Sequence, residues 1–129
     1  FYIMSFTNDK DSDNYATDKK GWEIIKKYIP NDKVIWAPFY CDGKQKEIFA
    51  DMGFDIIHED EDFFENDKGD IVIDNPPFSK MKDICIRLKE LDKPFIIIMP
   101  CFKLTTGYFR ECFGRFFKSY SDEVVSKSF

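Results

Sequence analysis

Short apolar runs with little polar alternation are the feature that most restricts how this chain can fold. The clearest are "DIVIDN", residues 70–75, and "KPFIIIMP", residues 93–100. A strand with one solvated face alternates polar and apolar residues, whereas a strand covered on both faces is apolar throughout. Both runs therefore predict strands buried on two sides, and the run at 93–100 predicts a central strand.

Helical segments separate these runs along the chain. Further strands are predicted at residues 33–40 and 54–60, helices at residues 17–28, 44–52 and 81–91, and a loop or single helical turn at residues 61–69. Residues 1–13 show only a weak, polar pattern. Strands connected through helices run parallel, so the expected fold class is α/β, a doubly wound Rossmann-like sheet.

The predicted helices carry apolar residues at helical spacing. Thr17 is expected to cap the first and Gly53 to end the second. The apolar faces are expected to be Trp22, Ile25 and Ile29 in the first helix, Ile48 and Met52 in the second, and Met81, Ile84, Cys85, Leu88 and Leu91 in the third. One more helical stripe comprises Tyr108, Phe109, Cys112, Phe113 and Phe116.

The charge balance limits the kinds of partner. The formal net charge of the 129 residues is -5, which removes the simplest argument for tight, stand-alone nucleic-acid binding, because that affinity comes mostly from Lys and Arg. Two groups of basic residues are interpreted first as solvated helix faces and second as a local basic face. They are Lys19, Lys20, Lys26 and Lys27, and Lys80, Lys82, Arg87 and Lys89.

Cysteine and histidine usage predicts no metal site. The four cysteines contain no CxxC pair, and the single His58 cannot complete a ligand set by spacing. His58 is expected to be a strand residue without a catalytic role. The cysteines are expected to be reduced and mostly buried, which favours an intracellular, reducing compartment. No run is long enough for a membrane span, so no membrane partner is expected.

The segment "DNPPF", residues 74–78, closes one of the buried strands. Ligands of open parallel sheets bind beyond the carboxyl ends of the strands. Pro76 and Pro77 fix the backbone and remove two N–H donors, Asn75 adds a side-chain carbonyl, and Phe78 adds a flat apolar face. This combination suits an exocyclic amine on a planar ring, because oxygens of Asn75 and Pro76 can accept its two protons while Phe78 stacks on the ring. The alternative is a rigid strand-to-helix turn.

The NPPF motif at this position resembles the catalytic motif of the S-adenosylmethionine-dependent amino-methyltransferases, closest to the DNA adenine-N6 branch. The likeness extends over most of the chain. "DNYATDKKGWEII" looks like the family's N-terminal cofactor motif, "APFYCDG" lies where the family has an acid-Pro-Phe-x-Gly-x-Gly loop, and "HEDEDFF" lies where acids and a Phe hold the ribose and adenine.

The resemblance implies roles for individual residues. The implied catalytic residues are Asn75, Pro76, Pro77 and Phe78. The implied cofactor-binding residues are Tyr15 and Thr17 at the methionine end, Pro38, Phe39 and Gly43 in the loop, Asp60 at the ribose, and Asp62 and Phe63 at the adenine. For Phe63 and Phe64, a place in the core below a solvated acidic loop is the equal alternative.

The chain departs from the family pattern in the cofactor loop. Ala37 replaces an acid that partners the cofactor's ammonium, Cys41 replaces the first loop Gly, and Asp18 stands where a Pro usually follows the Thr. A Cβ at a tight turn adds bulk and a backbone penalty, so Cys41 predicts weak or lost cofactor binding. Cys41 is interpreted as an incidental substitution, or as a reactive thiol whose pKa a helix N-terminus lowers.

The resemblance also sets expectations for domain organisation. Residues 1–129 are expected to form a single methyltransferase-like domain without a target-recognition domain. Only "RFFKSYSDEVVSKSF", residues 115–129, remains for the antiparallel hairpin that ordinarily follows the family's fifth strand. The sheet is therefore expected to lack part of the family's usual C-terminal hairpin.

Three functions are compatible with these observations. The first is S-adenosylmethionine-dependent methylation of a nucleobase amine, adenine N6 in DNA or, within the same class, guanine N2 in RNA. The second is a catalytically degenerate methyltransferase fold that serves as a structural or interaction subunit. The third is a binding module that keeps the nucleobase pocket without chemistry. For the first, nucleic acid is the expected partner, with DNA favoured over RNA and contacts supplied through a partner protein or by a single-stranded substrate.

Overall fold

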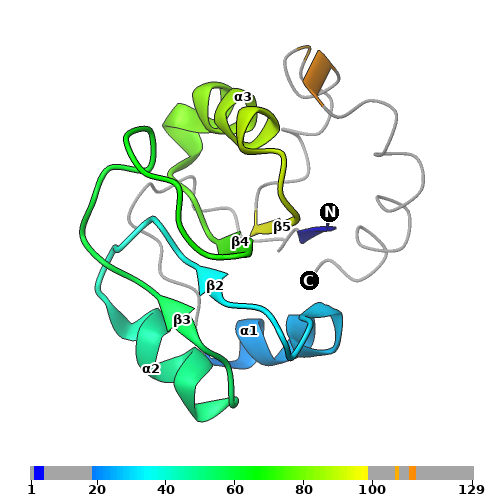
Figure 1. The fold of residues 1–129 in the computed structure, drawn as a ribbon, viewed down its shortest axis with the longest axis vertical. Coiled ribbons are helices and arrows are strands. Elements are labelled where there is room, and N and C mark those ends of the chain that lie inside the picture. Colours follow the sequence, from blue (N-terminus) through cyan, green and yellow to red (C-terminus); the bar gives the residue numbers. More distant parts are fainter. Residues whose placement is uncertain (1, 5–18, 99–106, 108–110, 113–129) are drawn as a thin grey trace.

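A computed structural model describes residues 2–4, 19–98, 107 and 111–112 (Figure 1). Within these residues, five parallel strands form one sheet in the order β1-β5-β4-β2-β3. The strands are β1 (Tyr2–Met4), β2 (Ile35–Trp36), β3 (Ile56–Ile57), β4 (Ile71–Asp74) and β5 (Phe95–Ile98). The helices are α1 (Lys19–Ile25), α2 (Lys44–Asp51) and α3 (Met81–Leu91), with single 3-10 turns η1 (Lys26–Tyr28) and η2 (Phe78–Lys80). The predicted parallel α/β architecture is confirmed for this part of the chain, and it is compatible with a Rossmann-like fold.

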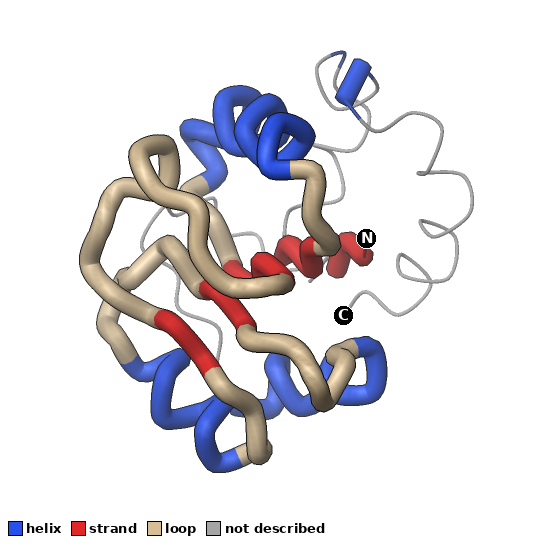
Figure 2. Tube along the Cα trace, in the orientation of Figure 1, coloured by secondary structure: helices blue, strands red, loops and turns tan. Residues whose placement is uncertain are grey.

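Helices cover both faces of the sheet, with α3 on one side and α1 and α2 on the other (Figures 1 and 2). Successive side chains of a strand point to opposite faces. Accordingly Val72 packs in the cluster under α3, while Ile71 and Ile73 pack in the cluster over α1 and α2. All four residues of β4 and all four of β5 are buried, as predicted for strands covered on both faces.

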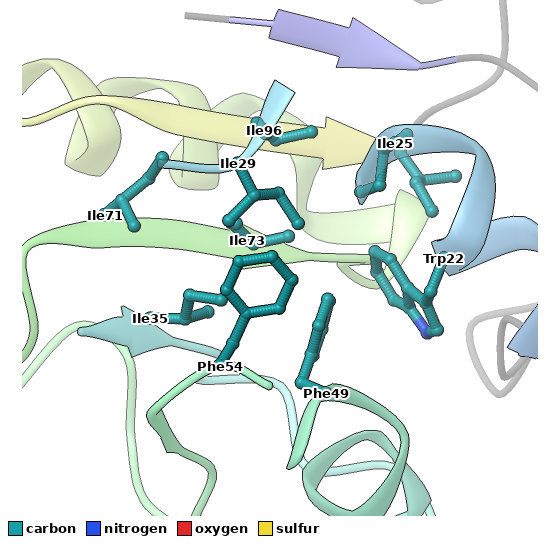
Figure 3. Packing of buried hydrophobic residues seen from close by; sticks show 10 residues of the cluster. Trp22, Ile25, Ile29, Ile35, Phe49, Phe54, Ile71, Ile73 and Ile96 are labelled. Atoms are coloured by element: carbon teal, nitrogen blue, oxygen red, sulfur yellow. The ribbon is translucent and has the colours of Figure 1, made fainter. Parts of the chain in front are cut away.

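Two buried clusters therefore make up the core. The α3-side cluster contains Trp36, Phe63, Val72, Met81, Ile84, Cys85, Leu88, Phe95 and Ile97. The α1/α2-side cluster contains Trp22, Ile25, Ile29, Ile35, Phe49, Phe54, Ile71, Ile73, Ile96 and Ile98 (Figure 3). The predicted apolar faces of the first and third helices lie in these clusters, apart from Leu91, which is half-buried against the first of them.

Helix α2 presents a different face from the one predicted. Its buried side chains are Gln45 and Phe49, while Ile48 and Met52 are half-buried at the edge of the same cluster. Phe49 meets Trp22 of α1 with ring centroids 5.0 Å apart, and Gln45 Nε2 donates to the carbonyl of Ile73 in β4 at 2.9 Å. These contacts of Phe49 and Gln45 orient the helix so that these two side chains face the core and Ile48 lies to one side. Gly53 ends the helix as predicted, at φ +90° with its N–H bonded to the Ala50 carbonyl.

The strands are shorter than the apolar runs suggest. β2 ends at Trp36 although the prediction extended to residue 40, because Pro38 has no N–H to continue the ladder. β3 ends at Ile57, and β4 ends at Asp74 before the two prolines. β5 ends at Ile98, and residues 99–100 of the predicted strand lie outside the described residues.

One strand has no counterpart in the prediction. β1 pairs in parallel with β5, with Tyr2 opposite Ile96 and Met4 opposite Ile98. Three residues are too few to show a period, so the weak pattern of residues 1–13 concealed it. Pairing with β1 on one side and β4 on the other makes β5 an interior strand, which confirms the central position predicted for it.

The amino-terminal side of β4 is held by a close turn. Gly69 has φ +67°, and a Cβ there would lie 2.9 Å from Cβ of Trp36 and 3.0 Å from the carbonyl oxygen of Val34, so only glycine fits. Lys93, before β5, donates to the carbonyls of Lys68 and Gly69 at 3.1 and 3.0 Å and pairs with Asp67. This lysine ties the turn at residues 67–69 to the neighbouring strand.

Several predictions lie outside the described residues. They concern the cap at Thr17, the helical stripe at Tyr108, Phe109, Phe113 and Phe116, and the missing C-terminal hairpin. Cys112 is described, and it packs half-buried against the α3-side cluster.

Truncation of Phe49 tests the α1/α2-side packing. The side chain is fully buried against Trp22 and Phe54, so Phe49→Ala is expected to lower the free energy of unfolding by about 3–5 kcal/mol. Urea unfolding measures this as a lower midpoint at an unchanged slope. Ile86→Ala, on the exposed face of α3 with 41% of the residue accessible, is the matched control and should change stability by less than about 0.5 kcal/mol. Equal effects of the two substitutions would contradict this packing.

Candidate functional site

The NPPF motif (residues 75–78) follows β4 at the point where the strand order reverses. The chain passes from β2 outward to β3, then returns to the other side of β2 as β4. The carboxyl ends of β2 and β4 are therefore neighbours, and this reversal is where open α/β sheets bind ligands. Two loops meet there: the cofactor loop predicted from the sequence (residues 37–43) and the NPPF motif.

A single buried carboxyl joins these two loops. Asp74, the last residue of β4, is 1% exposed. Its Oδ2 accepts the backbone N–H of Phe39 at 2.6 Å, and its Oδ1 accepts the backbone N–H of Asn75 at 2.7 Å. The Asp74 side chain thus fixes the start of the NPPF motif relative to a loop 35 residues earlier in the chain.

The surroundings of Asp74 determine its protonation. Burial raises the pKa of this carboxyl to about 8 from an ordinary 3.8, although the N–H donors of Phe39 and Asn75 act in the opposite direction. Loss of hydration of the charged form outweighs two hydrogen bonds. Asp74 is one of the site residues that were not predicted from the sequence, and the signal available was an acid at the end of an otherwise apolar strand.

The NPPF motif is partly accessible. Pro76 is buried, whereas Asn75, Pro77 and Phe78 are half-buried. Phe78 opens η2 and packs against the α3-side cluster, so its ring is positioned by the core. The motif therefore combines a rigid proline backbone with an amide and an aromatic side chain at the carboxyl edge of the sheet.

The predicted cofactor loop turns tightly into α2. Ala37 and Pro38 are buried, and Gly43 adopts φ +77° as the residue before the helix. Gly43 N–H donates to the Tyr40 carbonyl at 2.9 Å. A Cβ on Gly43 would lie 2.7 Å from the Tyr40 hydroxyl, so the glycine leaves room for the Tyr40 ring beside the loop backbone.

Cys41 occupies a backbone conformation that suits glycine. Its φ is +51°, in the left-handed region that non-glycine residues seldom adopt. Burial and the neighbouring Asp42 raise the pKa of the thiol above its ordinary value. The alternative of a thiol activated by the helix N-terminus is therefore wrong, because the shift has the opposite sign. Cys41 is also exposed rather than buried.

The aromatic pair next to the loop belongs to the core. Phe63 is 3% exposed and packs on Phe39 and Trp36, with ring centroids 5.0 and 5.5 Å apart. Phe64 is 38% exposed. A core position for both Phe63 and Phe64 was predicted from the sequence as the alternative to cofactor binding. The structure has Phe63 in the core and Phe64 at the surface.

The acids implied to bind the cofactor lie on the loop after β3. Asp60 is exposed, as is Asp62, whose Oδ1 accepts the Phe64 N–H at 2.8 Å. The Asp62 carbonyl also accepts Nδ2 of Asn66 at 2.8 Å. Asp62 therefore stabilises its own turn. Tyr15 and Thr17, the residues implied at the methionine end, lie outside the described residues.

His58 lies at the same edge of the sheet, directly after β3. It is 3% exposed, and its Nδ1 lies 2.8 Å from the Ala37 carbonyl oxygen. A carbonyl accepts, so Nδ1 carries the proton and Nε2 of the neutral ring is an acceptor. Tyr40 stacks on the imidazole with centroids 5.0 Å apart and planes 23° apart.

Among the described residues, no group of His, Cys, Asp and Glu side chains is arranged to hold a metal ion. None of the helices in that part of the chain has the length and hydrophobicity that a membrane crossing requires. A surface pocket of about 330 Å³ lies elsewhere, lined by Phe64, Asp83, Ile86, Arg87 and Glu90.

Comparison with known proteins returned no matching family model, no matching curated protein and no matching solved structure.

The raised pKa of Asp74 predicts a pH-dependent stability. The folded state holds the Asp74 proton up to about pH 8 and the unfolded state only to about 3.8, so the contribution of Asp74 to stability is greatest below the lower value and is lost as pH rises through the interval. The slope should be on the order of 1 kcal/mol per pH unit.

Asp74→Asn isolates this contribution. The amide keeps one acceptor for the two N–H groups, so the variant should be less stable at pH 4 and should lack this part of the slope. Urea unfolding at several pH values measures both effects. Parallel pH profiles of the variant and the wild type would show that Asp74 is ionised throughout.

Substitution of Cys41 tests the loop conformation. Cys41→Gly should raise the free energy of unfolding by up to about 1 kcal/mol, since glycine adopts the left-handed conformation without strain. Cys41→Val should lower it, because a β-branched residue is disfavoured there. The order of urea midpoints, Gly above Cys above Val, is the measurement, and the reverse order would place Cys41 in an ordinary conformation.

Proposed function

We propose that this protein transfers a methyl group from S-adenosylmethionine to an exocyclic amine of a nucleobase, with adenine N6 in DNA as the favoured target. The observation that carries the proposal is the position of the NPPF motif. It begins at the carboxyl end of β4, beside the reversal of strand order, and Asp74 ties it to the loop after β2. A cofactor site and an amine site would then adjoin each other.

In the loop of residues 37–43, one feature favours cofactor binding and another disfavours it. Gly43 supplies the left-handed glycine before α2 that lets backbone approach a ligand. Cys41 and the ring of Tyr40 add side chains to the same loop. When bound, the cofactor supplies an activated methyl electrophile.

The part of this chain in the reaction is to hold and polarise the amine. Oxygens of the Asn75 side chain and the Pro76 backbone accept its two N–H groups, which exposes the nitrogen lone pair. Phe78 stacks on the base and sets its plane. The methyl–sulfur bond would break as the methyl–nitrogen bond forms, and the methylated amine would release its extra proton to water, so no strong base is required. Positioning against an activated electrophile contributes many orders of magnitude in rate.

The net charge of -5 bears on the substrate. Contacts to a DNA backbone need cationic side chains, so a partner protein has to supply them or the substrate has to be single-stranded. Lys80 and Lys82, directly after the motif, are exposed and provide local positive charge. A guanine-N2 target in RNA has the same donor pattern at its exocyclic amine.

A second candidate function is favoured by the loop. Cys41 with φ +51° and Tyr40 beside Gly43 are the arrangement expected of a degenerate methyltransferase fold that serves as an interaction subunit. Calorimetric titration with S-adenosylhomocysteine separates the two candidates. Micromolar binding supports the enzyme, and no heat at millimolar ligand supports the interaction subunit.

Asn75→Ala tests the catalytic assignment. The variant should lose methyl transfer to single-stranded DNA and RNA oligonucleotides by at least about 100-fold, since it removes an acceptor aimed at the reacting amine, and should keep its affinity for S-adenosylhomocysteine. Asn31→Ala, at an exposed turn residue before β2, is the matched control and should leave both unchanged. Equal loss of transfer and of affinity in Asn75→Ala would mean that Asn75 is structural.

A further inference from the structure

The position of the Tyr40 ring follows neither from the proposed chemistry of the NPPF motif nor from packing in the core. It is 39% exposed, yet it stacks nearly parallel on the buried imidazole of His58. Its hydroxyl lies against the backbone of Gly43, at 2.7 Å from the position of a Cβ. A surface aromatic ring thus lies between a buried polar ring and a glycine at the carboxyl edge of β2 and β3.

His58 has an unused hydrogen-bonding atom at the edge of its ring. Its Nδ1 faces the Ala37 carbonyl, so in the neutral imidazole the lone pair is on Nε2 and points outward in the plane of the ring. Nε2 is buried and has no hydrogen-bond partner among the described residues. A buried acceptor without a donor costs free energy, and a ligand that stacks on the imidazole recovers it only if a hydroxyl or amine donor beside the stacked ring reaches this edge.

The expected adenine residue offers no comparable surface. Phe63 is 3% exposed and is enclosed by Phe39 and Trp36, so no planar ligand can reach its face. On the imidazole of His58, by contrast, the stacked ring belongs to Tyr40, a side chain that is exposed and can rotate. The place for a planar ring at this edge is therefore the one that Tyr40 now fills.

We propose that Tyr40 is a place-holder for a ligand ring: adenine stacks on His58 beside Gly43, and its binding displaces the Tyr40 side chain toward solvent. This inference rests on the proposed function for the identity of the ring, since adenine is the planar heterocycle that the cofactor brings. It assigns His58 as the stacking residue and Gly43 as the residue that leaves space for the ligand. Tyr40 becomes a competitor that lowers ligand affinity.

The chain has a single histidine, so the imidazole proton signals in an NMR spectrum belong to His58. In Tyr40→Ala without ligand these signals should move from their wild-type positions, because the ring current of the stacked tyrosine is lost. Adenosine, the probe, should shift them in both proteins. The bound spectra should agree, because the same ring then covers the imidazole.

Affinity gives the second measurement. Calorimetry should show that Tyr40→Ala binds adenosine roughly 3- to 10-fold more tightly than wild type, the factor that corresponds to one aromatic pair. Tyr40→Phe, which keeps the ring, should bind like wild type. Ile86→Ala, which truncates an equally exposed residue on α3, should also bind like wild type.

The outcomes distinguish this inference from the function on which it rests. Binding of S-adenosylhomocysteine with unmoved His58 signals, or weaker adenosine binding by Tyr40→Ala, overturns the place-holder and leaves methyl transfer standing. Adenosine that shifts the His58 signals while no oligonucleotide is methylated supports the place-holder and overturns methyl transfer. Absence of adenosine binding to either protein overturns the place-holder.

Discussion

Burial of β4 on both faces is the constraint on which the rest of this structure depends. Its four side chains are all excluded from water, so helices must cover both sides of the sheet, and α3 and the pair α1 and α2 do so. The fourth of these side chains is a carboxyl. A polar group excluded from water needs partners, and Asp74 finds them in the backbone of two loops. The burial of β4 thus also determines how the two loops of the candidate site are connected.

Patterns that repeat along the chain made the fold predictable. Unbroken apolar runs revealed the buried strands, and the spacing of Met81, Ile84, Cys85 and Leu88 revealed α3 with its buried face. Where a local pattern was absent the prediction failed. β1 depends on a partner strand more than ninety residues away, and no short window contains that information.

The face of α2 was mispredicted for a tertiary reason. Both Ile48 and Phe49 are apolar, and which of them is buried depends on the Trp22 ring and on the Ile73 carbonyl that Gln45 reaches.

The candidate site was also predictable only in part. The NPPF motif and Gly43 were recognisable from their letters, and the structure places both at the reversal of strand order. The contacts of Asp74, His58 and Tyr40 join residues from different strands and loops, so they emerge only from the folded chain.

Different kinds of interaction hold the loops at the two ends of the parallel strands. At the amino-terminal edge, Lys93 binds the turn before β4, and its acidic partner Asp67 has 57% of its side chain exposed. At the carboxyl-terminal ends of the strands the connection is made by the carboxyl of Asp74, which is 1% exposed. Dissolved ions screen the first and leave the second unchanged. A rise in ionic strength will therefore weaken the ion pair of Lys93 with Asp67, while the bonds from Lys93 to the carbonyls of Lys68 and Gly69 and the spacing of the candidate-site loops persist. The molecule thus has one salt-sensitive contact at the amino-terminal ends of its strands and a salt-independent one at the carboxyl-terminal ends.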